Sequence, residues 1–241
     1  MQKALFVLTS TDRFPDDAGE AAGRKTGYYI DELAAPWAAL VDAGVHIEFA
    51  SIAGGEPPID PNSLPDDEDE RPAPVKRLLA DDDAMAKLKA SLPIAEIDGT
   101  AFDLVFLPGG HGTMFDFRKS EDLARVIGTA WDKGAVVGAV CHGPAGLIEA
   151  RDASGTPIVK GRRVNGFTNS EEDAAGLTEA VPYLLETQLR EQGAAFEGGA
   201  DFESFAVRDG RLVTGQNPQS AEAVGALLVE ALAERNTQDA A

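Results

Sequence analysis

The stretch Lys133–Gly146, with the sequence KGAVVGAVCHGPAG, decides the fold of this chain. Its first half, from Ala135 to Val140, is apolar, rich in valine and too short for a helix that spans a core, which is typical of a buried strand in a parallel sheet. Pro144 suits the first turn of a helix, because its missing N–H would have no partner there in any case. The stretch therefore predicts a sharp turn from strand to helix at Cys141, the single cysteine of the chain.

A cysteine at such a turn has the position of the nucleophile in the elbow of hydrolases, with sulfur in place of the serine oxygen. The positive end of a helix dipole and its unpaired N–H groups favour the thiolate, which is the nucleophilic form. The same N–H groups can stabilise an oxyanion that forms when sulfur adds to a carbonyl. The alternative is that Cys141 is only a small buried hydrophobe, as most lone cysteines are. The strand-Cys-His-Gly-Pro context favours the nucleophile.

Strand-like and helix-like patterns alternate along the rest of the chain, which predicts an α/β fold. We expect a three-layer sandwich, with a mostly parallel central sheet flanked by helices and the cysteine on a nucleophile elbow. The predicted strands cover residues 3–9, 45–50, 102–107 and 135–140, a short strand near 163–164, and a hairpin over 205–214 with Asp-Gly at its turn. The predicted helices include residues 33–41, 75–91, 121–133, 180–192 and 218–234.

The length of 241 residues predicts a single domain over residues 1–241. Residues 54–74 differ in composition, since they hold six prolines and the acidic run DDEDE at 66–70. They predict an acidic, proline-rich insertion without regular structure, which either covers the mouth of a pocket or forms a solvated loop. Residues 235–241 are expected to be a frayed tail.

The charge balance argues against two classes of partner. The chain has 41 acidic and 21 basic residues, a formal net charge of −20, and such a surface repels nucleic acid and anionic membranes. Nothing resembles a signal peptide, and no apolar stretch is long enough to span a bilayer. A single cysteine excludes an intrachain disulfide and a multi-cysteine metal site. We therefore expect a cytoplasmic protein without a metal, a nucleic-acid partner or a membrane partner.

The loop Pro108–Gly112 is expected to lie beside Cys141. Both follow predicted strands, and in a doubly wound sheet the site lies beyond the carboxyl ends of the strands. The pair Gly109-Gly110 can supply a backbone N–H opposite the sulfur, although taken alone the pair is only a turn. It is not a phosphate loop, because no lysine-serine or lysine-threonine follows. His111 in this loop is expected to line the cleft.

Further ionisable side chains are candidates for the same pocket. His142 is the imidazole nearest to Cys141 in sequence, and Glu32 lies at the start of a predicted helix. Glu171 and Glu172 lie where another helix begins. Each glutamate has a structural alternative, since acids are favoured in a first helical turn and a glutamate can close a capping box.

Several motifs occur in one order along nearly the whole chain. They are KTG at 25–27 with DEL at 31–33 and Pro36, LPGGHG at 107–112, AVCHGP at 139–144, GFTNSEE at 166–172, and DGRLVTGQNP at 209–218. In this order the motifs resemble the PfpI superfamily, which has the class I glutamine amidotransferase-like fold. Within it they are most similar to the branch of glutathione-independent glyoxalases (glyoxalase III) and heat-shock holding chaperones.

The resemblance implies a role for each matching residue. It makes Cys141 the nucleophile, His142 its acid–base partner, Glu172 the acidic member that orients the histidine, and Glu32 the carboxyl group that contacts the sulfur and moves protons. Glu171 in place of Glu172 stays open as an alternative. Substrate and oxyanion binding falls to the loop and elbow, with Gly109, Gly110 and His111 as the binding residues and the N–H groups of Gly110 and His142 at the oxyanion position.

The chemistry expected of these groups needs neither a metal nor a redox cofactor. Thiolate adds to the aldehyde of a small dicarbonyl such as methylglyoxal, a base moves a proton through an enediol-like species, and a 2-hydroxy acid leaves. The alternatives are a stress-response holding chaperone, and a cysteine hydrolase that acts as a peptidase or deglycase. A glutamine amidotransferase is rejected, because that family places its catalytic histidine late in the chain and no histidine follows His142. The resemblance also implies a homodimer.

Overall fold

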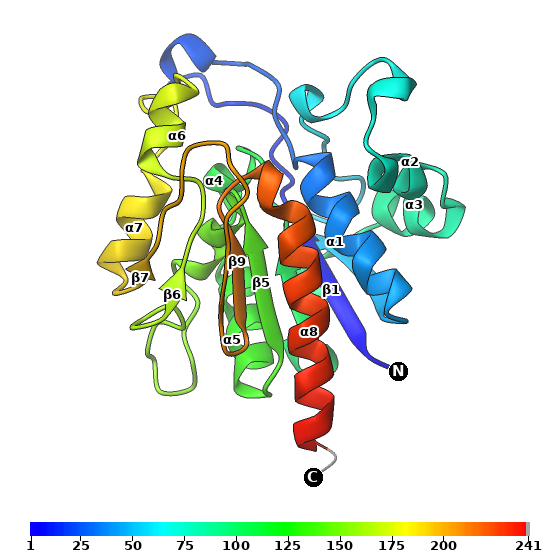
Figure 1. The fold of residues 1–241 in the computed structure, drawn as a ribbon. Helices are drawn as coiled ribbons and strands as arrows, with labels where there is room; N and C mark the ends of the chain where they lie inside the picture. Colours follow the sequence, from blue (N-terminus) through cyan, green and yellow to red (C-terminus); the bar gives the residue numbers. More distant parts are fainter. Residues whose placement is uncertain (240–241) are drawn as a thin grey trace.

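A seven-stranded sheet forms the centre of the molecule, and the computed structural model describes residues 1–239 (Figure 1). The strand order is β3-β2-β1-β4-β5-β9-β8, and every neighbouring pair is parallel except the antiparallel hairpin of β8 and β9. A separate parallel pair joins β6 and β7. The strands are β1 (Lys3–Leu8), β2 (His46–Ser51), β3 (Leu92–Pro93), β4 (Leu104–Leu107), β5 (Val136–Val140), β6 (Arg163–Val164), β7 (Ala195–Phe196), β8 (Ala206–Asp209) and β9 (Leu212–Gly215).

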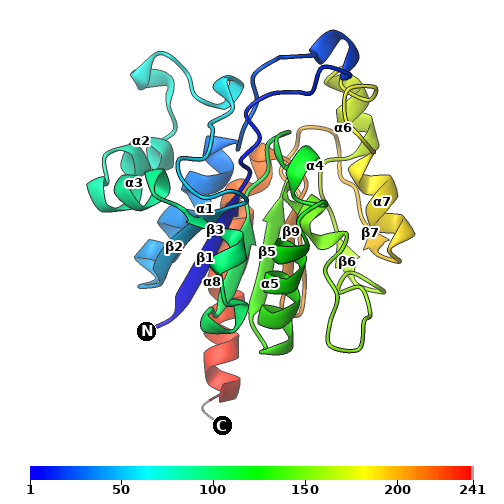
Figure 2. The same ribbon diagram turned by 180° about the vertical axis from the view of Figure 1, so that it is seen from behind.

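Helices cover both faces of the sheet, which confirms the predicted three-layer sandwich. Figure 1 shows α1 and α8 on one face, and the reverse view in Figure 2 shows α5 on the other. Strands β1, β4 and β5 are buried along almost their whole length, because helices cover them on both sides. The α-helices are α1 (Ile30–Asp42), α2 (Ala73–Leu79), α3 (Asp82–Lys89), α4 (Thr113–Asp116), α5 (Glu121–Asp132), α6 (Asn169–Ala174), α7 (Leu185–Glu191) and α8 (Ala221–Asp239).

Three predicted helix boundaries are wrong. The helix expected over 75–91 is two helices, because the Asp81 side chain accepts a hydrogen bond from the N–H of Ala84 and starts α3 as a new helix. The helix expected over 180–192 begins only at Leu185, since a proline at 182 disfavours helical backbone in the residue before it. The helix expected over 218–234 runs from Ala221 to Asp239. The frayed tail expected over 235–241 stays a prediction, and residues 240–241 lie outside the described part.

Two long loops lie over the carboxyl ends of the parallel strands (Figure 1). The first loop lies between β1 and α1 and folds back on itself, because the N–H of Phe14 donates to the carbonyl of Arg24 at 2.9 Å. The second is the insertion 54–74, which holds two short 3₁₀ turns before α2 begins. The insertion is hydrogen-bonded to the start of α1, because the N–H of Tyr28 donates to Pro58 and the N–H of Asp60 donates to Tyr28, both at 2.9 Å. Both loops thereby have fixed positions beside the strand ends.

No helix among the described residues combines the length and apolarity that crossing a bilayer requires.

Candidate active site

Cys141 stands on a strained turn directly after β5. Its φ of 57° is in the left-handed region that residues with a side chain rarely adopt. Hydrogen bonds on both sides stabilise this conformation, since the N–H of Cys141 donates to Gly215 and its carbonyl accepts from Phe167. The elbow is confirmed, and the helix predicted after it is a five-residue 3₁₀ helix, Gly143–Leu147. The turn presents a free thiol that is 3% exposed.

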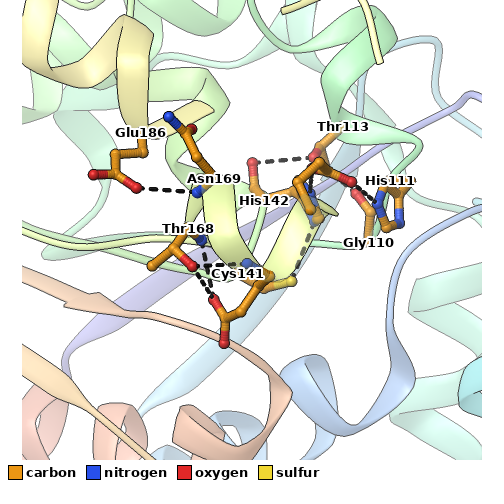
Figure 3. Close-up of polar contacts among 10 residues, drawn as sticks. Gly110, His111, Thr113, Cys141, His142, Thr168, Asn169 and Glu186 are labelled. Carbon is orange, nitrogen blue, oxygen red and sulfur yellow. Dashed lines mark hydrogen bonds and ion pairs between the residues drawn. The ribbon is translucent and has the colours of Figure 1, made fainter. Parts of the chain in front are cut away.

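A hydrogen-bonded relay runs from the thiol into the protein. The Cys141 sulfur lies 3.3 Å from Nδ1 of His142 (Figure 3). Nε2 of His142 lies 2.8 Å from Oε2 of Glu172. Burial, with the neighbouring His111 as second cause, lowers the pKa of His142, which favours a neutral imidazole. A carboxylate only accepts hydrogen bonds, so Nε2 carries the single proton of that imidazole. Nδ1 is then free to accept the proton of the thiol.

Glu172 accepts hydrogen bonds from two histidines. Its Oε1 lies 2.8 Å from Nε2 of His111, and the rings of His111 and His142 have centroids 4.1 Å apart. Burial opposes the charge of this carboxyl group, but the two imidazoles outweigh burial and hold the pKa of Glu172 well below its usual value. Glu172 is therefore ionised, and it fixes the orientation of both rings. His111 was predicted to line the cleft, and the structure gives it this second contact as well.

The neighbouring Glu171 has a different environment. Its side chain and that of Thr168 form a reciprocal capping box at the start of α6, and its Oε1 accepts from the N–H of Phe202 and the amides of Gln216 and Asn217. Of the two glutamates, Glu172 is the one that is hydrogen-bonded to His142, so the geometry favours Glu172 for the acidic position. Thr168 followed by a glutamate three residues later is a sequence signal that assigns Glu171 to the cap.

Glu32 is buried on α1, and its carboxyl group interacts with the Cys141 thiol. The N–H of Gly109 donates to its Oε2 at 2.7 Å, whereas Oε1 has no partner at full hydrogen-bond distance among the described residues. Burial raises the pKa of Glu32 to about 8, although the contacts with Cys141 and Gly109 act in the opposite direction. The carboxyl group is therefore largely protonated at neutral pH, and Oε1 is the oxygen free to carry the proton.

The sulfur itself is less acidic than the sequence predicted. Burial, followed by the charge and hydrogen bond of Glu32, raises the pKa of Cys141 well above its ordinary value. The backbone N–H groups of Gly110 and His142 donate to the sulfur and act in the opposite direction, but they do not outweigh burial. The thiolate expected from the sequence is therefore disfavoured in the unliganded site, because the thiol is withdrawn from water. The two N–H groups do converge where they were expected.

In the loop after β4, the N–H groups of Gly110 and Gly109 have different partners. A φ of 99° at Gly110, accessible to glycine, turns its N–H toward the sulfur. Gly109 was also predicted to bind substrate, and its N–H donates to Oε2 of Glu32 at 2.7 Å. Sequence patterns gave no signal for Thr113, whose single hydroxyl proton lies between the carbonyls of Gly110 and His142, at 2.8 and 3.1 Å from its oxygen, and so links the two loops.

A pocket of about 230 Å³ opens above the thiol. Burial raises the pKa of Tyr29 in its wall to about 12, so this phenol stays protonated and can donate a hydrogen bond. Sequence patterns gave no signal for most of the wall, because loops that are distant in the sequence supply it. The lining residues that the sequence analysis missed are Phe14, Arg24, Tyr29, Asp60, Asn62, Phe167, Ala175, Leu177, Phe202, Pro218 and Gln219.

One group of side chains in the described part of the chain has the spacing of metal ligands. His111, His142 and Glu172 offer ligand atoms that all lie within 4.8 Å of one another. The same atoms already form the hydrogen bonds of the relay. These hydrogen bonds hold the three side chains in their positions.

A cysteine on a strand elbow, a buried histidine beside it and a carboxylate behind the histidine define a class of α/β proteins built for nucleophilic chemistry. The chain belongs to the DJ-1/PfpI family, whose sequence model matches residues 27–231. This confirms the resemblance to the PfpI superfamily.

Named relatives lie close to this chain. Glyoxalase 3 of Candida albicans is 34% identical over 228 residues, covering 92% of this chain and 94% of that protein. Glutathione-independent glyoxalase HSP31 of Saccharomyces cerevisiae is 31% identical, covering 96% and 98%. The solved structure of Rapid Encystment Protein 24 KDa from Francisella tularensis is 35% identical, with a TM-score of 0.88 and coverage of 96% and 99%.

Proposed function

We propose that this protein is a glutathione-independent glyoxalase that converts small 2-oxoaldehydes, such as methylglyoxal, to 2-hydroxy acids. The observation that carries the proposal is the relay from Cys141 through His142 to Glu172 at the base of a small pocket. Its volume of about 230 Å³ suits a substrate of a few carbon atoms. The named glyoxalases among the relatives, which match over nearly their whole length, support the same activity.

In the first step, the sulfur of Cys141 adds to the aldehyde carbon and forms a hemithioacetal. Nδ1 of His142 accepts the thiol proton, and the ionised Glu172 stabilises the imidazolium that results. The thiol thus becomes nucleophilic as its proton leaves, so no stable thiolate is needed beforehand. The N–H groups of Gly110 and His142 are placed to donate to the developing oxyanion.

In the second step, a proton moves from the former aldehyde carbon to the neighbouring carbon through an enediol. His142 first returns the thiol proton to the hemithioacetal oxygen and is then neutral again, so its Nδ1 can take the proton from the former aldehyde carbon while the protonated Oε1 of Glu32 gives one to the ketone oxygen. His142 then protonates the neighbouring carbon, and Glu32 recovers its proton from the remaining enediol hydroxyl. The product at this stage is a thioester of the 2-hydroxy acid on Cys141. Water then cleaves the thioester, releasing the acid and restoring the thiol, so that one water is consumed and no electron acceptor is required.

The competing functions lack a supporting observation of this kind. A holding chaperone needs exposed apolar surface. The large hydrophobic side chains that are exposed in the described part of the chain are Met1, Leu92 and Phe202. A cysteine hydrolase would use the same relay, but the small pocket favours a small substrate over a peptide. We further propose a cytoplasmic, single-domain protein that forms a homodimer, as the family resemblance implies.

The test is lactate formation from methylglyoxal without glutathione, comparing the wild type with Cys141→Ala. We expect lactate from the wild type, and at least about a 10³-fold loss in the variant, because the covalent route is removed. Circular dichroism confirms that the variant is folded. A wild type that cleaves peptides and leaves methylglyoxal unchanged contradicts the proposal and favours a hydrolase.

A further inference from the structure

One arginine in the pocket wall has no role in the relay. Arg24 is exposed, lies on the hairpin loop between β1 and α1, and lines the same pocket as Cys141. The loop is held in place, because the N–H of Phe14 donates to the carbonyl of Arg24 and the N–H of Arg24 donates to the carbonyl of Ala21. Phe14 packs against the ring of His111, with centroids 5.7 Å apart. The backbone of Arg24 is thus positioned relative to the site.

The guanidinium of Arg24 is unusual for this protein. Each of the other twelve arginines donates at least one hydrogen bond from its side chain, mostly to carboxylates or carbonyls. In the described part of the chain, the Arg24 side chain forms no hydrogen bond and no ion pair. The guanidinium is unpaired although acids outnumber bases in this chain by 41 to 21. Guanidinium groups bind carboxylates in a two-pronged geometry.

The charges near Arg24 indicate what its guanidinium binds. Glu172 is ionised, and Asp60 in the wall accepts hydrogen bonds from Thr26 and Asn62. Arg24 is the single arginine or lysine among the lining residues. A neutral 2-oxoaldehyde needs no cation for binding. The reaction of one 2-oxoaldehyde with one water, however, yields a 2-hydroxy acid that ionises to a carboxylate and a proton at neutral pH. An anion therefore arises in a pocket whose other fixed charges repel it.

We propose that Arg24 is a carboxylate-recognition residue at the pocket mouth, which binds the 2-hydroxy acid product and small monocarboxylates that compete with it. This inference rests on the proposed function for the identity of the product. The guanidinium offers the new carboxylate a charged partner outside the relay, so that the product leaves the sulfur without displacing Glu172 from His142. Arg24 acts on product binding and on selectivity, and takes no part in the covalent step.

The experiment measures ligand binding to a variant without the nucleophile, so its result does not depend on the glyoxalase activity. Sodium lactate and its neutral isostere lactamide are titrated into the Cys141→Ala protein and followed by ligand-observed NMR. The same titrations are made after adding Arg24→Gln, Arg24→Lys or Lys25→Gln. Lys25→Gln is the matched control, since it removes the same charge one residue away, from an exposed side chain that does not line the pocket.

We expect lactate to bind more tightly than lactamide, and Arg24→Gln to weaken lactate binding about tenfold with lactamide unchanged. Arg24→Lys should recover part of this loss, and Lys25→Gln should change lactate binding less than twofold. Equal binding of lactate and lactamide, undetectable binding of lactate, or an equal loss in Lys25→Gln would overturn the proposal. A protein that binds lactate through Arg24 yet forms none from methylglyoxal would contradict only the proposed function.

Discussion

Replacing Glu172 by glutamine tests the relay at the residue that accepts from both histidines. Glu172 accepts two hydrogen bonds at 2.8 Å, one on each oxygen. Glutamine has one oxygen and one amide nitrogen, so only one histidine keeps an acceptor. If the oxygen faces His111, the amide N–H meets Nε2 of His142 and forces its proton to Nδ1. His142 can then no longer accept the proton of the Cys141 thiol.

The size of the effect follows from the contacts that are lost. A hydrogen bond to a charged group contributes about 1.5–3 kcal/mol, and the imidazolium formed during reaction also loses its ionised partner. At about 1.4 kcal/mol per factor of ten, the lost hydrogen bond alone should lower kcat for methylglyoxal about 10- to 10²-fold in Glu172→Gln. Substrate binding in the pocket involves other groups, so KM should change little.

Glu171→Gln is the matched control for this experiment. Glu171 accepts from five groups with both oxygens, and none of them belongs to the relay. Its substitution should lower the melting temperature and leave kcat within about threefold of the wild type, because the loss falls on the cap and not on the imidazole. Steady-state kinetics gives kcat for both variants, and thermal unfolding gives their melting temperatures. Wild-type kcat in Glu172→Gln, or an equal loss in both, would refute the assignment.

Two further substitutions test the environment of the site. Burial raises the pKa of Glu32 from 4.5 to about 8, so the folded chain binds more protons than the unfolded chain between these values. The free energy of unfolding should therefore fall as pH rises through this window. Urea titrations at several pH values should show a weaker pH dependence of this free energy for Glu32→Gln than for the wild type. An equally strong pH dependence in both proteins would contradict the raised pKa of Glu32. A Cβ at Gly27 would lie 2.1 Å from the carbonyl oxygen of Pro58. Gly27→Ala should therefore lower the free energy of unfolding by about 1–3 kcal/mol. It should also raise KM, because the displaced loop moves Asp60 out of the pocket wall. Gly198→Ala is the control, since its Cβ would meet its nearest neighbour at 3.6 Å, and the reasoning fails if both variants unfold alike.

Local patterns were enough to predict the sheet and the elbow. The run from Ala135 to Val140 is apolar at every position except a glycine, and a strand covered on both faces requires this composition. Cys141 and His142 are adjacent in sequence, so their contact needed no knowledge of the fold. Motif order then brought Glu32 and Glu172 to the same pocket, although residues far from the elbow in the chain supply them.

The pocket wall and the state of the sulfur could not be predicted in this way. Asp60, Asn62 and Arg24 come from loops whose position depends on hydrogen bonds to other segments, such as that between Tyr28 and Pro58. No periodicity encodes such contacts. The prediction of an ionised thiol failed for a related reason, because it weighed the helix terminus and had no means of weighing burial.

A neutral thiol at rest follows from the balance of charges around Cys141. Two backbone N–H groups favour the thiolate, but withdrawal from water and the carboxyl group of Glu32 oppose it more strongly. The neutral Nδ1 of His142 lies 3.3 Å from the sulfur, so the proton has an acceptor as soon as an electrophile arrives. The carbonyl oxygen of a bound substrate takes up the negative charge that the sulfur gives up, and the N–H groups of Gly110 and His142 can then donate to that oxygen. In the proposed mechanism, the elbow therefore couples ionisation of the sulfur to substrate addition. Because the left-handed turn fixes the position of Cys141, the N–H groups of Gly110 and His142 can donate first to the sulfur and then to the substrate oxygen.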